Sequence, residues 1–185
     1  MTLKIDMTYF MRKLFSLSSL LALSGLFIVS GCGVYSFTGT STPAKTISIT
    51  EFYNNADLGP ANMGQTFSNE LKTYFIQNSN LTVVPEQGEL QMDGEITNFQ
   101  LSPIAAVSTG DPNDFNTASA TRLTITVRVT YVNTLDETMS FKDKSFSFYK
   151  DFDNEENFGD VEEQFTRQIF ERIINDIYNA SIANW

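Results

Sequence analysis

Residues 122–132, Arg-Leu-Thr-Ile-Thr-Val-Arg-Val-Thr-Tyr-Val, alternate between polar and apolar side chains as far as Tyr131. A repeat of two is typical of a β-strand with one face in a core and the other face outside it. The inner face of this strand would carry only apolar side chains, and the outer face carries threonines together with Arg122 and Arg128. We therefore expect a half-buried strand here, with the rest of the domain built around it.

Weaker strand patterns flank this segment. Leu90 and Met92 share one face of an alternating run, whereas Phe99 falls in the opposite phase, and this predicts a β-bulge near Asn98. A long loop rich in turn residues, 102–120, follows that run. The remaining strands are predicted at residues 46–52, 81–84, 90–101 and 139–152.

Two segments have the spacing of amphipathic helices. Residues 61–78 place apolar side chains every three or four positions after Gly59-Pro60, and residues 165–177 place one every four. Asp160 and Glu163 are predicted to form the N-cap of the second helix and its return partner. The expected fold is α+β: a two-layer sandwich in which a small, mainly antiparallel sheet of four to five strands carries both helices on one face.

The N-terminus resembles the leader of a bacterial lipoprotein. Residues 14–29 are mostly apolar and follow Arg12-Lys13, but the run is broken by serines and is shorter than the roughly 20 residues of a membrane span. The run ends in Val-Ser-Gly-Cys, which resembles a lipobox and contains the single cysteine. We expect cleavage between Gly31 and Cys32 and acylation of Cys32, with an uncleaved signal anchor as the alternative.

This leader defines the predicted organisation of the chain. Residues 1–31 form the signal peptide, residues 32–45 a lipid-anchored tether, and residues 46–185 a single domain. A mature chain of this size buries roughly 70% of its unfolded surface, which is sufficient for a core. Gly33, and not Asp, follows the cysteine, and by resemblance to known sorting rules the domain is expected to hang from the outer membrane into the periplasm.

Charge is distributed unevenly. The chain has a net charge of −10, which argues against nucleic acid as a partner. Residues 122–150 are locally basic, and such a strip can meet an anionic lipid headgroup. In the alternative, these cations protect strand edges or pair with acidic neighbours in the domain. The residues of this strip predicted to contact such a headgroup are Arg122, Arg128, Lys142 and Lys144.

The residue inventory argues against catalysis. The chain contains no histidine, so serine–histidine and cysteine–histidine nucleophile systems and histidine-ligated metals are absent. Residues 151–156 are acidic but lack the spacing of a calcium loop. Paired carboxylates capable of acid–base work occur, but such residues are more often solvated; they are Glu89 with Asp93 and Glu162 with Glu163. We expect no catalytic residue, no metal and no cofactor.

Five segments, in order along the chain, resemble the LptE family of lipopolysaccharide-assembly lipoproteins in its Bacteroidetes form. They are Cys-Gly-Val-Tyr-Ser-Phe-Thr-Gly at 32–39, Gly-Glu-Ile-Thr-Asn-Phe at 94–99, Arg-Leu-Thr-Ile-Thr-Val-Arg-Val at 122–129, Phe-Ser-Phe-Tyr-Lys-Asp-Phe at 146–152 and Ile-Tyr-Asn-Ala-Ser-Ile-Ala-Asn-Trp at 177–185.

The resemblance implies a role and a partner. Members of the family are outer-membrane lipoproteins that sit inside the LptD β-barrel, help it to assemble, and assist insertion of lipopolysaccharide into the outer leaflet. It also implies a small sheet backed by two helices. The alternative function is that of an independent periplasmic lipoprotein that binds a lipid or glycan, with the loop 102–120 and its Phe115 as the contact region.

Overall fold

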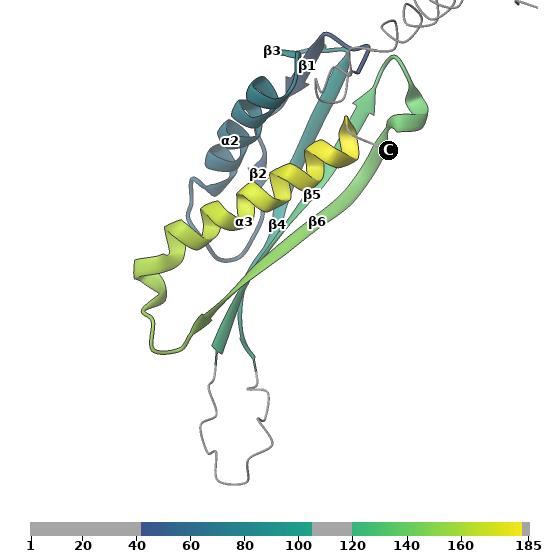
Figure 1. Cartoon of the computed structure of the whole chain (residues 1–185). Helices are drawn as coiled ribbons and strands as arrows, with labels where there is room; N and C mark the ends of the chain where they lie inside the picture. Colours follow the sequence, from purple (N-terminus) through teal and green to yellow (C-terminus); the bar gives the residue numbers. More distant parts are fainter. Residues whose placement is uncertain (1–41, 105–119, 183–185) are drawn as a thin grey trace, which may run out of the picture. The chain divides into compact units, whose positions relative to one another are not determined.

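The computed structural model describes residues 42–104 and 120–182 (Figure 1). Their elements, in chain order, are β1 (Thr46–Ile49), β2 (Tyr53–Asn54), α2 (Met63–Asn78), β3 (Thr82–Val84), β4 (Leu90–Ile104), β5 (Ala120–Asn133), the 3-10 helix η2 (Glu137–Met139), β6 (Phe141–Asp153) and α3 (Phe158–Ser181). None of the described helices is both long and apolar enough to cross a membrane. The predicted signal peptide, the cleavage site at Gly31 and Cys32, and Phe115 lie outside the described residues.

The strands form one six-stranded mixed sheet in the order β3-β1-β4-β5-β6, with β2 paired to β4. β4, β5 and β6 form an antiparallel meander, whereas β1 runs parallel to both β3 and β4. The parallel pairing of β1 with β3 follows from α2, which connects them and returns the chain to the same edge of the sheet. The expected α+β sandwich is confirmed, and the two-residue strand β2 raises the number of strands to six.

The alternation predicted for residues 122–132 is confirmed in β5. The fully buried inner positions of this strand are Leu123, Ile125, Val127 and Val129. The predicted bulge is also present, because the register between β4 and β5 shifts between Ile96 and Asn98. β4 continues beyond the predicted end at residue 101, since its pairing with β5 runs on to Ile104 opposite Ala120.

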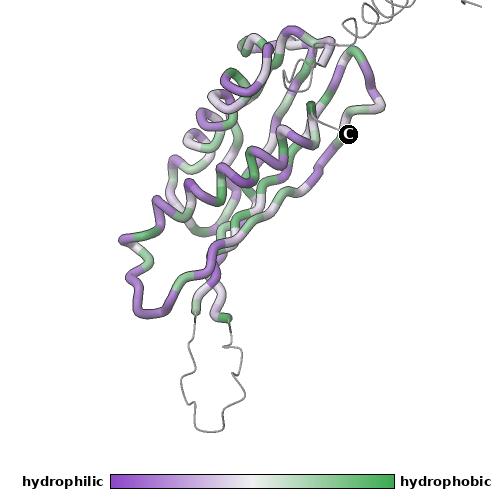
Figure 2. The backbone as a smooth tube through the Cα atoms, in the orientation of Figure 1, coloured by the Kyte–Doolittle hydropathy of each residue, from purple (hydrophilic) through white to green (hydrophobic). Residues whose placement is uncertain are grey.

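Both helices lie on the same side of the sheet (Figure 1). Phe67 of α2 joins the two layers: its ring centre lies 4.9 Å from that of Phe170 on α3 and 5.1 Å from that of Phe52. The helices run in the same direction, because the Tyr178 hydroxyl near the end of α3 donates to the carbonyl of Asn78 at the end of α2. Figure 2 shows hydrophobic and hydrophilic residues alternating along the strands, as expected for a sheet with one buried face.

The predicted N-cap of α3 was wrong. The cap is Asn157, whose side-chain oxygen accepts a hydrogen bond from the Gly159 amide at 3.2 Å, and Asp160 lies inside the first turn. The helix starts earlier because Phe158 packs on Phe152, with ring centres 5.6 Å apart, and so fixes the first turn against the sheet. Asp160 still favours the helix, since a negative charge in the first turn interacts well with the helix dipole.

Candidate functional site

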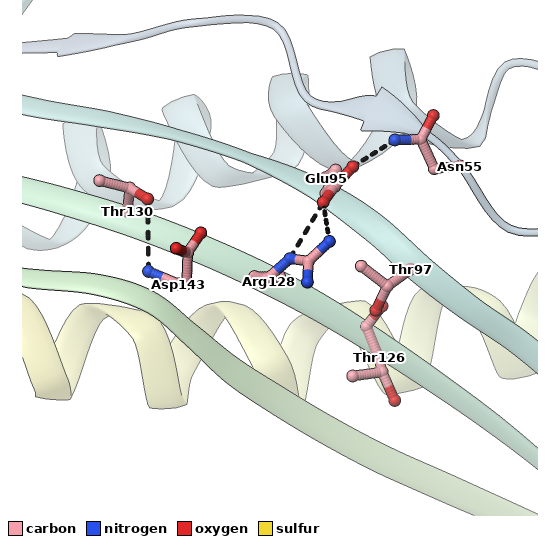
Figure 3. A network of polar contacts seen from close by, with 7 residues as sticks. All are labelled: Asn55, Glu95, Thr97, Thr126, Arg128, Thr130 and Asp143. Carbon is pink, nitrogen blue, oxygen red and sulfur yellow. Dashed lines mark hydrogen bonds and ion pairs between the residues drawn. The ribbon is translucent and has the colours of Figure 1, made fainter.

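The side of the sheet turned away from α2 and α3 is the candidate functional surface, and we call it the open face. The register of β4, β5 and β6 brings polar side chains together there, because directly opposite residues of antiparallel strands share a face. Figure 3 shows part of this face, with both helices behind the strands. The open face of the meander includes Asp93, Glu95, Asn98, Gln100, Ser102, Arg122, Thr124, Thr126, Arg128, Thr130, Ser145, Ser147, Tyr149 and Asp151.

Arg122 is held by an ion pair across the sheet. Its Nε and Nη2 donate to Oδ1 and Oδ2 of Asp151 at 2.7 and 2.8 Å, a two-point contact between directly opposite residues of β5 and β6. The guanidinium also lies on the ring of Tyr149, with Cζ 3.6 Å from the ring centre. The hydrogen bonds from Arg122 lower the pKa of the Asp151 carboxyl. The guanidinium is thus fixed in orientation and largely neutralised.

Arg128 also forms an ion pair on the open face, but with the neighbouring strand β4. Its Nε and Nη2 both donate to Oε1 of Glu95, directly opposite on β4, with the Nε contact at 3.0 Å (Figure 3). The amide of Asn55 donates to the other oxygen of the same carboxylate. The hydrogen bond from Arg128, followed by that from Asn55, lowers the pKa of Glu95. One carboxylate therefore links β4, β5 and the residue that follows β2.

The surface next to Arg128 is acidic. A shallow hollow of about 200 Å³ opens there, and its lining includes four carboxylates but only one cation. It is lined by Thr50, Glu51, Tyr53, Asp93, Gly94, Glu95, Arg128, Thr130 and Asp143. An anionic group that approaches Arg128 would have to displace Glu95 and also tolerate the remaining carboxylates.

The lysines predicted for the same basic strip do not all share this face. The register between β5 and β6 shifts between Val129 and Tyr131, next to Asp143, which has a left-handed φ of 52°. The shift brings Phe141 opposite Tyr131. Lys144 lies opposite Val129, on the helix side of the sheet with Phe146, by simple alternation along β6, and its ammonium lies 5.1 Å from the ring centre of Phe141. Lys142 is exposed on β6. The structure therefore keeps Arg122 and Arg128 on one face, six residues apart along β5, and places Lys144 on the other face.

The carboxylates weighed above for acid–base chemistry or calcium binding lie in separate parts of the fold, and some are bound by groups of the domain itself. Glu89 accepts hydrogen bonds from the amides of Lys45 and Thr46 and so holds the start of β1. Glu162 and Glu163 lie on α3, and both line a cleft between the helices. Asp151, the first residue of the acidic run 151–156, forms an ion pair with Arg122.

Sequence reasoning missed the residues that engage the two arginines. Asp151 and Tyr149 could not be found by counting back from the turn between β5 and β6, because the register shift between Val129 and Tyr131 moves the pairing by one residue. Glu95 could not be found either, because its register with Arg128 depends on how the chain returns after the long connection between β4 and β5.

Solved structures with a related arrangement share little sequence with this chain. A hypothetical protein from Chlamydia trachomatis is 10% identical, with 76% of this chain and 99% of that chain covered and a TM-score of 0.48. A minor lipoprotein from Acinetobacter baumannii is 13% identical, with 76% and 94% covered and a TM-score of 0.44. The uncharacterized lipoprotein B from Nitrosomonas europaea is 12% identical, with 73% and 80% covered and a TM-score of 0.44.

A search of curated proteins finds no significant match. The sequence profile of the LptE family, described as lipopolysaccharide-assembly, matches residues 44–181. The match takes in every strand and helix of the described domain, from β1 to the end of α3. This chain belongs to the LptE family of lipopolysaccharide-assembly proteins.

Proposed function

We propose that this protein is an outer-membrane lipoprotein, anchored through acyl groups on Cys32, that occupies the lumen of an LptD-type β-barrel. There it helps the barrel to assemble and assists insertion of lipopolysaccharide into the outer leaflet. The observation that carries the proposal is the family match over residues 44–181, which lies behind a lipobox-like leader. The LptE family is not an enzyme family, and the role proposed here is one of scaffolding and contact.

The geometry of the domain supports contact with the barrel through its exposed surface, including the open face. The helix side of the sheet is filled by the core, where Val127 on β5 and Phe67 on α2 have no exposed surface. The open face is rich in hydroxyl and amide groups, which can exchange hydrogen bonds with a polar wall. An overall acidic chain favours partnership with the barrel over direct capture of an anionic glycolipid.

Direct contact with lipopolysaccharide remains a second proposal, for Arg122, Arg128, Lys142 and Lys144. Guanidinium groups suit phosphate because they donate two parallel hydrogen bonds. In this chain, a phosphate that binds Arg122 would take the place of Asp151, and one that binds Arg128 would take the place of Glu95. Because Lys144 lies on the helix side, a phosphate on the open face would contact Arg122 or Arg128 without it.

The test is a photocrosslinking purification from detergent-extracted outer membranes. A photoreactive residue replaces Thr126 on the open face in one variant and the partly exposed Lys72 of α2 in another. Because a plug is enclosed by its barrel, both variants should yield a stoichiometric adduct with a large β-barrel protein, and Cys32→Ala should abolish both adducts by mislocalising the protein. Recovery of the lipoprotein alone from both variants would favour the alternative, an independent binder of a lipid or glycan.

A further inference from the structure

A cleft of about 350 Å³ lies between the N-terminal halves of α2 and α3, in the helix layer and away from the open face. Its volume is within the range of small-molecule sites. Buried apolar side chains, Met63 and Phe170, form part of its wall. The other lining residues are Pro60, Asn62, Thr66, Glu70, Gly159, Glu162, Glu163, Thr166 and Arg167.

Two polar atoms of this cleft are buried without a hydrogen bond. Among the described residues, Oε2 of Glu70 and Oγ1 of Thr166 are the buried side-chain atoms that have no partner. Thr166 is 7% exposed. Leaving a buried polar group unpaired is unfavourable, and more so for a charged group. Both atoms accept hydrogen bonds, so a ligand that brings donors would satisfy both.

The charges of the cleft select a cation. Arg167 is the cation in the lining, and it is paired with Glu163, with Nη2 and Oε1 2.7 Å apart. Glu70 and Glu162 remain as negative charges. Burial raises the pKa of Glu70, nearby Arg167 lowers it in part, and nearby Glu171 raises it further, so the carboxylate would be stabilised by an additional cation. Thr166 lies more than two turns into α3, beyond the reach of the positive helix end.

The form of the cation follows from the lining. No group of three or more ligating side chains is brought together within residues 42–104 and 120–182, so the donor set suits an ammonium group better than a metal ion. We propose that the cleft binds a primary alkylammonium group, which donates to Glu70 and Thr166 while its alkyl stem lies against Met63 and Phe170. A lysine side chain and a small free amine share this chemistry.

Met63 lines the cleft, and its methyl group provides a reporter of binding there. The full-length chain, purified in detergent and labelled with 13C-methyl methionine, is titrated with n-butylammonium chloride at constant ionic strength. We expect the Met63 signal to shift saturably while that of Met92, buried in β4, stays in place. The neutral analogue n-butanol should bind about ten-fold more weakly or not at all, because it lacks the charge. Equal binding of n-butanol would overturn the proposal.

Three variants test the residues. Glu70→Gln should weaken n-butylammonium binding about ten-fold, and Thr166→Val should weaken it less, because one neutral hydrogen bond is lost. Glu86→Gln removes the same charge at an exposed position outside the lining and should leave binding unchanged. Wild-type affinity in both cleft variants would overturn the proposal.

The source of the ammonium is decided with a second probe. If Nα-acetyl-lysinamide shifts Met63 as strongly as n-butylammonium does, the cleft accepts a lysine side chain of a protein. If only n-butylammonium binds, the cleft accepts a free amine. Either result supports the site, and failure of both probes to shift Met63 overturns it, whether or not the barrel crosslinks are found.

Discussion

Arg122 and Asp151 lie directly opposite each other on β5 and β6 and are joined by two hydrogen bonds of 2.7 and 2.8 Å. The arginine singled out as a contact for an anionic ligand therefore already has an anionic partner within its own domain. Any phosphate on this face competes with a carboxylate whose position is set by the sheet.

This pair gives a pH prediction. Because the pKa of Asp151 is lowered from its ordinary value of 3.8, its contribution to stability is present above pH 3.8 and is lost as the pH falls through the folded value. Asp151→Asn should therefore lower the urea midpoint at pH 7 but have less effect at about pH 3. Asp153→Asn removes a charge from the same strand without breaking this pair, and an equal pH-dependent loss there would contradict the assignment.

Charge reversal separates a structural arginine from a ligand contact. Arg122→Glu with Arg128→Glu places like charges opposite Asp151 and Glu95, and we expect reduced lipopolysaccharide export at the cell surface. The swap Arg122→Glu with Asp151→Arg restores the pair but moves the cation to β6. If the guanidinium of Arg122 contacts phosphate, the swap should recover stability but not export. Normal export in the double reversal would remove these arginines from the proposal.

Ser68 makes a buried bridge between α2 and the chain after β1. Its hydroxyl accepts from the Phe52 amide at 2.8 Å and donates to the Gly64 carbonyl at 2.7 Å. Ser68→Ala leaves the Phe52 amide buried and unpaired and should lower the unfolding free energy by about 1–3 kcal/mol in urea titrations. Thr73→Ala removes an exposed hydroxyl bonded within the same helix and should change it by less than about 0.5 kcal/mol.

Gly94 occupies a position in β4 with no room for a side chain. A Cβ there would lie 2.4 Å from the Arg128 carbonyl oxygen and 2.5 Å from the ring of Phe52. Since the first of these atoms is backbone, Gly94→Ala should destabilise the domain by about 1–3 kcal/mol, measured as a shift of the urea midpoint. Gly159→Ala is the matched control, because its Cβ would meet only the Asn157 side chain, at 3.6 Å. A neutral Gly94→Ala would show that the two strands can separate locally.

The start of α3 distinguishes the two capping residues. Asn157→Ala removes the side-chain acceptor of the Gly159 amide and should cost about 1 kcal/mol. Asp160→Ala removes only a favourable charge in the first turn and should cost about 0.5 kcal/mol. Thermal unfolding of the two variants shows which substitution destabilises the protein more. A larger loss of stability for Asp160→Ala would indicate that Asp160 is the N-cap.

Much of the fold could be read from periodicity. The alternation in residues 122–132 identified the inner face of β5, and the phase change near Asn98 identified the bulge, because side chains of a strand point to opposite sides in turn. The apolar stripes of α2 and α3 likewise predicted which helix faces are buried. The N-cap of α3 was misplaced because Asn157 and Asp160 are both suitable capping residues, and the packing of Phe158 chose between them.

Less of the candidate site could be predicted from the sequence alone. Alternation placed Arg122 and Arg128 on the outer face of a strand, since that depends only on neighbouring residues. Their engagement by Asp151 and Glu95 needed the folded sheet, whereas Lys144 shares the face of Phe146 and Phe148 by alternation alone. The reason is physical: the face of a residue follows from local geometry, whereas its cross-strand partner follows from register, which turns, bulges and the packing of distant segments set together.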